Sequence, residues 1–80
     1  MTRYAFNQAL SEALNKVLQA HERELWARAR AETTTNAPMS VHIANDRALE
    51  DACTVRQAAV IEFTDTMLDL IEQQHAAFAA

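Results

Sequence analysis

Large apolar residues recur at helical spacing through the first thirty residues of the chain. The first four of them are separated by steps of four, four and three, which is the period of one helix face. Strong helix formers dominate this stretch, and nothing in it breaks a helix. The pattern therefore predicts one helix over residues 2–31. Its expected apolar stripe consists of Phe6, Leu10, Leu14, Val17, His21, Leu25 and Trp26, with Leu18 to one side.

The same kind of pattern predicts a second helix over residues 45–78. Asn45 is a favourable N-cap, and the acidic residues that follow it suit a helix N-terminus. Ile61 and Leu68 lie outside the main stripe, one heptad apart, so this helix is expected to contact two neighbours. The main stripe alternates steps of four and three, like the a and d positions of a coiled coil. It consists of Leu49, Cys53, Arg56, Val60, Phe63, Met67, Leu70, Gln74 and Ala77, with Ile71 and Phe78 on one flank.

Residues 32–44 are expected to hold the turn between the two helices. Pro38 moves the residue before it out of helical geometry. Apolar and other residues then alternate from Met39 to Ala44, which is the period of a short strand. An irregular loop or an early start of the second helix is the favoured alternative for these six residues. A ribbon-helix-helix regulator would need a further break after the strand, and the second helix contains no Gly or Pro.

Folding the helices back on each other predicts a register. With the turn midway between Ala31 and Asn45, residues face each other when their numbers sum to about 76. This register sets Phe63 near Leu14, so large apolar groups meet large apolar groups.

The predicted register also brings together three polar residues, His21, Glu24 and Arg56. An ionised arginine inside a core needs a partner, because an uncompensated buried charge is strongly destabilising. Glu24 is the expected partner of Arg56. We interpret the three residues as a polar core layer that sets the helix register. A cluster that contacts a ligand or a partner is the alternative.

Composition limits how much of a core one chain can form. Of its 40 hydrophobic residues, 17 are alanine, and small domains commonly need disulfides, metals or oligomerisation. The lone Cys53 excludes an intrachain disulfide. We therefore predict an all-α fold in a single domain, 1–80, in which two long antiparallel helices form a hairpin. Two hairpins are expected to form a homodimer, as a four-helix bundle or coiled-coil-like assembly.

Several functional classes are excluded by the same composition. The absence of glycine removes every Gly-rich phosphate loop. No charge-free apolar run approaches the roughly 20 residues that span a bilayer. The first ten residues lack the apolar stretch of a signal peptide, and one cysteine fits a reducing compartment. The chain is expected in the cytoplasm.

No catalytic, cofactor or metal site is expected. Glu72 and His75 have the Glu-x-x-His spacing of di-iron bundles, but the register places no bridging Glu opposite them, and a solvated helix end is the better interpretation. His21 and His42 lack acidic or cysteine ligands at metal spacing. Cys53 has no histidine placed to activate it.

Charge is more informative, because the chain carries a net charge of −4 and residues 57–80 hold four acids and no Lys or Arg. This acidic surface either keeps the protein solvated or docks on a basic patch of a partner. The predicted partner-binding residues are Ile61, Asp65, Leu68, Asp69 and Glu72.

The sequence therefore predicts a non-enzymatic protein-binding module. A small acidic helical dimer of this kind would act as an adaptor, chaperone or inhibitor of a second protein, and its profile fits a phage or other mobile element. The alternative is a small dimeric transcriptional or nucleic-acid regulator, although the overall charge disfavours it. Its basic turn end would consist of Arg23, Arg28, Arg30 and Arg47.

Overall fold

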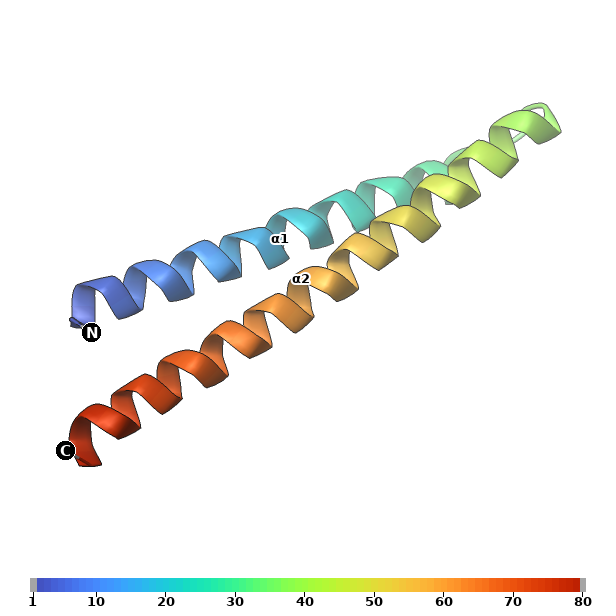
Figure 1. The fold of residues 1–80 in the computed structure, drawn as a ribbon. Helices are drawn as coiled ribbons and strands as arrows, with labels where there is room; N and C mark the ends of the chain where they lie inside the picture. The colour runs from blue at the N-terminus through green and yellow to red at the C-terminus, as the bar shows by residue number, and fades with distance from the viewer. Residues whose placement is uncertain (1, 80) are drawn as a thin grey trace.

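The protein is a hairpin of two long helices that lie side by side in opposite directions (Figure 1). The computed structural model describes residues 2–79, and the side chains of residues 2–76. Helix α1 spans Arg3–Thr33 and helix α2 spans Met39–Ala79. The hairpin measures 64 × 16 × 12 Å, and both termini lie at its open end. The prediction of an all-helical hairpin is confirmed, and no strand occurs between residues 2 and 79.

Side-chain hydroxyls cap both ends of α1. Thr2 is the N-cap, and its hydroxyl oxygen accepts a hydrogen bond from the backbone amide of Ala5 at 3.1 Å. At the other end, the hydroxyls of Thr33 and Thr34 donate to the carbonyls of Ala29 and Arg30, each at 2.6 Å. Helix ends leave backbone groups without intrahelical partners. The threonine run therefore ends α1 slightly later than residue 31, by satisfying its last carbonyls.

Residues 39–44 form the first part of α2, so the early helix start that was one of the alternatives for this segment is confirmed, whereas the strand and the loop are wrong. The carbonyl of Pro38 accepts the first bonds of the helix, from the amides of Val41 and His42. Proline suits a helix start, where its missing N–H has no partner to lose. The chain reverses at Asn36, whose φ of 55° is a left-handed conformation that asparagine tolerates better than most residues. The alternation that resembled a strand was too short to outweigh this start signal.

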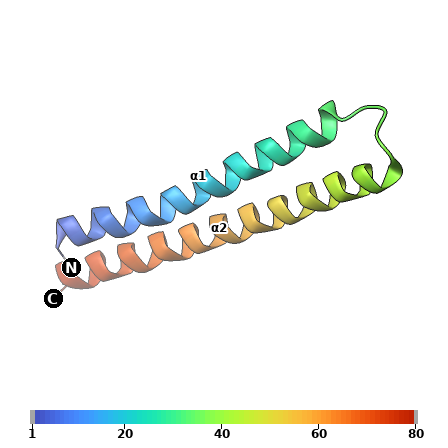
Figure 2. The same ribbon diagram turned by 90° about the horizontal axis from the view of Figure 1, so that it is seen from above.

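Asn45 consequently lies inside α2 and is not its N-cap. Its side chain is buried, and its amide nitrogen donates to the hydroxyl of Thr34 at 3.2 Å. Since Thr34 follows the last residue of α1, the six residues from Met39 to Ala44 extend beyond the end of α1 (Figure 2). This contact ties the end of α1 to the second turn of α2.

The surface through which α1 meets α2, which we call the seam, combines alanines with larger side chains. Alanines at heptad spacing, with Ala13 and Ala20 the most buried, allow the two backbones to lie close together. The expected stripe of large residues was therefore partly wrong, because Leu14, Leu25, Trp26 and His21 are exposed. The α1 seam consists of Phe6, Leu10, Ala13, Val17, Ala20, Glu24, Ala27 and Ala31.

The seam of α2 also differs from the predicted stripe at some positions. Val60 is exposed, whereas its neighbour Ala59 faces α1. Cys53, Met67 and Gln74 are half-buried at one flank. The predicted seam residues Ala77 and Phe78 lie outside the described side chains. The observed α2 seam consists of Asn45, Leu49, Ala52, Arg56, Ala59, Phe63, Thr66 and Leu70.

The observed register is shifted by about three residues from the predicted sum of 76. Lys16 contacts Glu62, Glu24 contacts Arg56, and Thr34 contacts Asn45, so facing residues sum to 78–80. The shift arises because the first residues of α2, Met39 to Ala44, extend beyond the end of α1. The midpoint between facing residues therefore lies inside α2 and not at the centre of the turn.

One hairpin leaves most of its large apolar side chains in solvent. Its accessible surface is 6258 Å², whereas a compact monomer of 9.0 kDa exposes about 4,900 Å². The excess is about 1,400 Å² per chain. No described side chain larger than alanine is less than 2% exposed, so the seam alone does not enclose a core.

Candidate functional site

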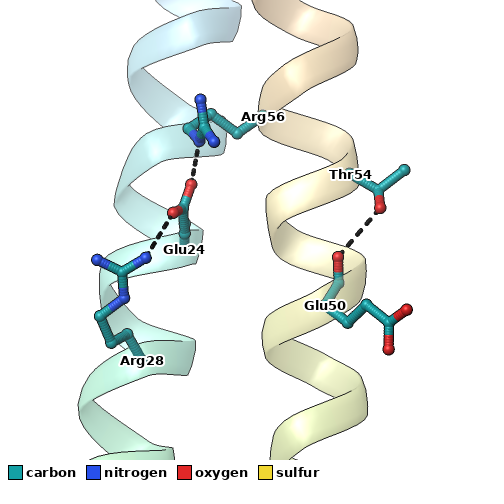
Figure 3. Close-up of polar contacts among 5 residues, drawn as sticks. All are labelled: Glu24, Arg28, Glu50, Thr54 and Arg56. Atoms are coloured by element: carbon teal, nitrogen blue, oxygen red, sulfur yellow. Dashed lines mark hydrogen bonds and ion pairs between the residues drawn. The ribbon is translucent and has the colours of Figure 1, made fainter.

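A three-residue ion-pair cluster occupies the middle of the seam (Figure 3). Glu24, on α1, is buried, and its side chain is only 7% exposed. The Nε of Arg56 reaches across from α2 and donates to one carboxylate oxygen, while Arg28, one turn along α1, donates to the other at 3.0 Å. Each oxygen of the buried carboxylate therefore has a charged partner, which is what a buried ion needs to avoid a large penalty.

The surroundings of Glu24 act on its pKa in opposite directions. Burial acts to raise the pKa, because the charged form loses its hydration. The hydrogen bond and positive charge of Arg56 lower it, and smaller contributions from a hydrogen bond with Cys53 and the charge of Arg28 act the same way. The lowering effects prevail, so the pKa of Glu24 lies below its ordinary value. The cluster is therefore ionised at neutral pH.

This lowered pKa predicts a specific acid sensitivity. A carboxyl group with a depressed pKa in the folded state stabilises the fold above its ordinary pKa, and this contribution disappears as the pH falls through the folded-state pKa. We expect the difference in thermal midpoint between the native chain and Glu24→Gln to be constant at a pH well above the ordinary carboxyl pKa of 4.5 and to shrink as the pH falls below it. Circular dichroism melts across this range measure it. Parallel curves throughout the titration would contradict the prediction.

The predicted polar layer is present only in part. Glu24 and Arg56 lie together, but His21 is exposed and is not part of a buried layer. Arg28 was missed as a member, although its spacing of four residues from Glu24 on one helix is a usable signal. Cys53 is half-buried with a free thiol, next to Glu24 rather than next to a histidine. The role of the cluster in setting register stays a prediction.

One side of the hairpin carries a shallow groove between the helices, with a volume of about 340 Å³. Ala20 and Ala59 border the groove at the seam. Lys16 and Glu62 bridge its rim through an Nζ–Oε1 contact of 2.9 Å. Both partners are largely exposed, and such pairs contribute little to stability. The groove marks the charged side of the molecule.

The predicted partner-binding residues lie in the second half of α2, and all of them are exposed. Ile61 and Leu68 are 62% and 53% exposed and lie two helical turns apart. The carboxylates of Asp65, Asp69 and Glu72 follow along the same helix, one turn apart. The helix thus presents two large apolar side chains beside a row of acids, with neither group used by the seam.

The structure does not support the other candidate sites. In the part of the chain that the structure describes, no three His, Cys, Asp or Glu side chains gather as a metal site would require. Arg28 of the expected basic turn end is bound to Glu24, while Arg23 lines the groove, so these arginines do not share one surface. Neither described helix combines the length and apolarity needed to cross a membrane.

Comparison with other proteins adds nothing to this geometry. The chain matches no protein-family model, no curated protein and no solved structure.

Proposed function

We propose that this protein is a non-enzymatic, cytoplasmic protein-binding module that works as a homodimer of helical hairpins. The observation that carries the proposal is the surface that one hairpin leaves uncovered, about 1,400 Å² more than a compact chain of its mass exposes. Most of the large apolar side chains of the described residues lie on the exposed surface, and exposed apolar patches on a small protein are typical of association surfaces. The module acts on a second protein as an adaptor, chaperone or inhibitor.

The partner-binding surface consists of the exposed outer side of α2. Its two apolar side chains, Ile61 and Leu68, fit a hydrophobic groove at the spacing of helix-in-groove recognition. The adjacent carboxylates of Asp65, Asp69 and Glu72 fit Lys or Arg residues at the rim of that groove. Complementary charge of this kind steers association and sets orientation. The expected partner is therefore a protein with an apolar groove bordered by basic residues.

Charge reversal tests this surface. We expect Asp65→Lys and Asp69→Lys combined with Leu68→Glu to weaken partner binding at least about tenfold, because an apolar anchor and the complementary charges are lost together. The native chain is used to capture its partner from cells of its source, and the captured protein is then titrated against the purified native and variant chains. Unchanged affinity of the triple variant would contradict the proposed surface.

A matched variant controls for charge and folding. Glu12→Lys and Glu22→Lys combined with Trp26→Glu make the same three kinds of change on exposed residues of α1, with the same change in net charge. We expect this control to bind the partner as the native chain does. If both triple variants lose binding equally, the effect reports net charge and not the α2 surface.

A further inference from the structure

Charge divides the hairpin into two unlike sides. The groove shows which residues of α1 and α2 lie on the same side of the hairpin. Each of its rim residues comes one position before a seam residue. These rim residues are Lys16, Gln19 and Arg23 on α1, and Val55 and Glu62 on α2. In an antiparallel pair, the residues that follow a seam residue by one position must then share the opposite side.

That opposite side carries no Lys, Arg, Asp or Glu over two thirds of α1 and the facing part of α2. We call it the uncharged face. It includes six of the thirteen large apolar side chains that are exposed among the described residues, and the charged residues on this side of the hairpin occur only near the turn, from Arg28 to Glu50. The uncharged face consists of Tyr4, Asn7, Ser11, Leu14, Leu18, His21 and Leu25 on α1, and Cys53, Gln57, Val60, Thr64, Met67, Ile71 and Gln74 on α2.

We propose that the uncharged face is covered by the same face of a second copy of this chain, so that two hairpins pack around a two-fold axis. The inference rests on the proposed homodimer and identifies the surface that forms it. It leaves the partner-binding side of α2 exposed in the dimer.

The charge distribution favours a second copy of this chain as the molecule that covers the uncharged face. Each chain carries a net charge of −4, so two copies repel each other through any acidic surface. A two-fold interface apposes each surface patch to itself. The uncharged face can meet itself without bringing like charges together, whereas the acidic side of α2 cannot.

The surface area that two chains would bury also favours a second copy of this chain. If each chain buries its excess of about 1,400 Å², the two chains together bury about 2,800 Å², which lies within the range of obligate homodimers. Such a contact covers the seam flank where Cys53 and Met67 are already half-buried. The result is a four-helix bundle whose core holds the large side chains of the uncharged face together with those of the two seams.

A pair of matched substitutions tests the proposal. Val60 and Val55 lie five residues apart in the middle of α2, are 39% and 49% exposed, and lie on the uncharged and charged sides. We expect the native chain and Val55→Glu to sediment as dimers at micromolar concentration. Val60→Glu should raise the dimer dissociation constant at least about 100-fold, because the carboxylate enters the interface twice.

A labelling measurement covers the case in which Val60→Glu fails to fold. In a Cys53→Ser background, Gln57→Cys and Ala58→Cys place single thiols on adjacent exposed residues of the uncharged and charged sides. At concentrations where the dimer forms, a maleimide should label Cys at position 57 at least about tenfold more slowly than at position 58. Dilution into monomer should remove the difference.

The outcomes are distinct. Equal labelling in the dimer, or dissociation by Val55→Glu rather than Val60→Glu, would overturn the uncharged face as the interface while leaving a homodimer intact. A native chain that sediments as a folded monomer would overturn both this inference and the proposed homodimer. Partner binding by the Asp65 and Leu68 surface is measured separately and does not depend on either result.

Discussion

Replacing Ala13 with leucine is expected to lower the free energy of unfolding by about 1–3 kcal/mol, which for a chain of this size lowers the thermal midpoint by roughly 5–20 °C. Ala13 is one of the most buried residues of the seam. Leucine has nearly the same helix propensity as alanine, so the loss would come from packing. Three added carbon atoms must either clash with α2 or push the two helices apart.

The matched control is Ala29→Leu, which makes the same change on an exposed position of the same helix. We expect this variant to melt within a few degrees of the native chain, since surface substitutions usually change stability by less than about 0.5 kcal/mol. Thermal unfolding followed by circular dichroism compares the two. If both leucine variants melt together, the alanine seam does not hold the helices close.

The second large effect is expected from Arg56→Leu, which should lower the thermal midpoint by roughly 5–15 °C. The substitution leaves the buried carboxylate of Glu24 with Arg28 as its remaining partner in the cluster. Removing one member of a buried ion pair is more damaging than removing both, because the remaining charge keeps its desolvation penalty.

A double substitution distinguishes pairing from simple loss of packing. Glu24→Leu together with Arg56→Leu should recover most of the stability that Arg56→Leu loses, since apolar residues often replace a buried ion pair without destabilising the fold. Sedimentation of the same variants tests the register role, because an all-apolar layer is expected to permit other oligomeric states. Additive losses in the double variant would mean that the two side chains are not coupled.

Pairing between Glu24 and Arg56 could be anticipated from sequence for a simple reason. A charged residue inside a helical stripe needs a counter-ion, and few positions on the facing helix offer one. The predicted pairing of Glu24 with Arg56 was correct despite a register error of about three residues, because the long side chain of Arg56 can reach a partner one helical turn away. His21 was wrongly included because the contact face of α1 follows Ala20 and Glu24, one residue round the helix from the predicted stripe through His21 and Leu25.

The start of α2 shows a different limit. Asn45 is a good N-cap by residue type, but Pro38 offers an equally good start seven residues earlier. Local preferences allow both. The hydrogen bond from the buried Asn45 amide to Thr34 forms only when α2 extends past the end of α1, so a contact between the two helices accompanies the earlier start.

Periodicity, the single proline and the absence of glycine were enough to determine that this chain forms two long helices with a turn within residues 32–44, because helix formation depends on local residue preferences. Which side of each helix faces the other was decided only by the tertiary structure. Apolar residues occur on more than one side of both helices, and a pattern in one helix carries no information about how closely its neighbour approaches. Close approach favours alanine at the seam, and most of the leucines, isoleucines and valines lie on the outside of the hairpin.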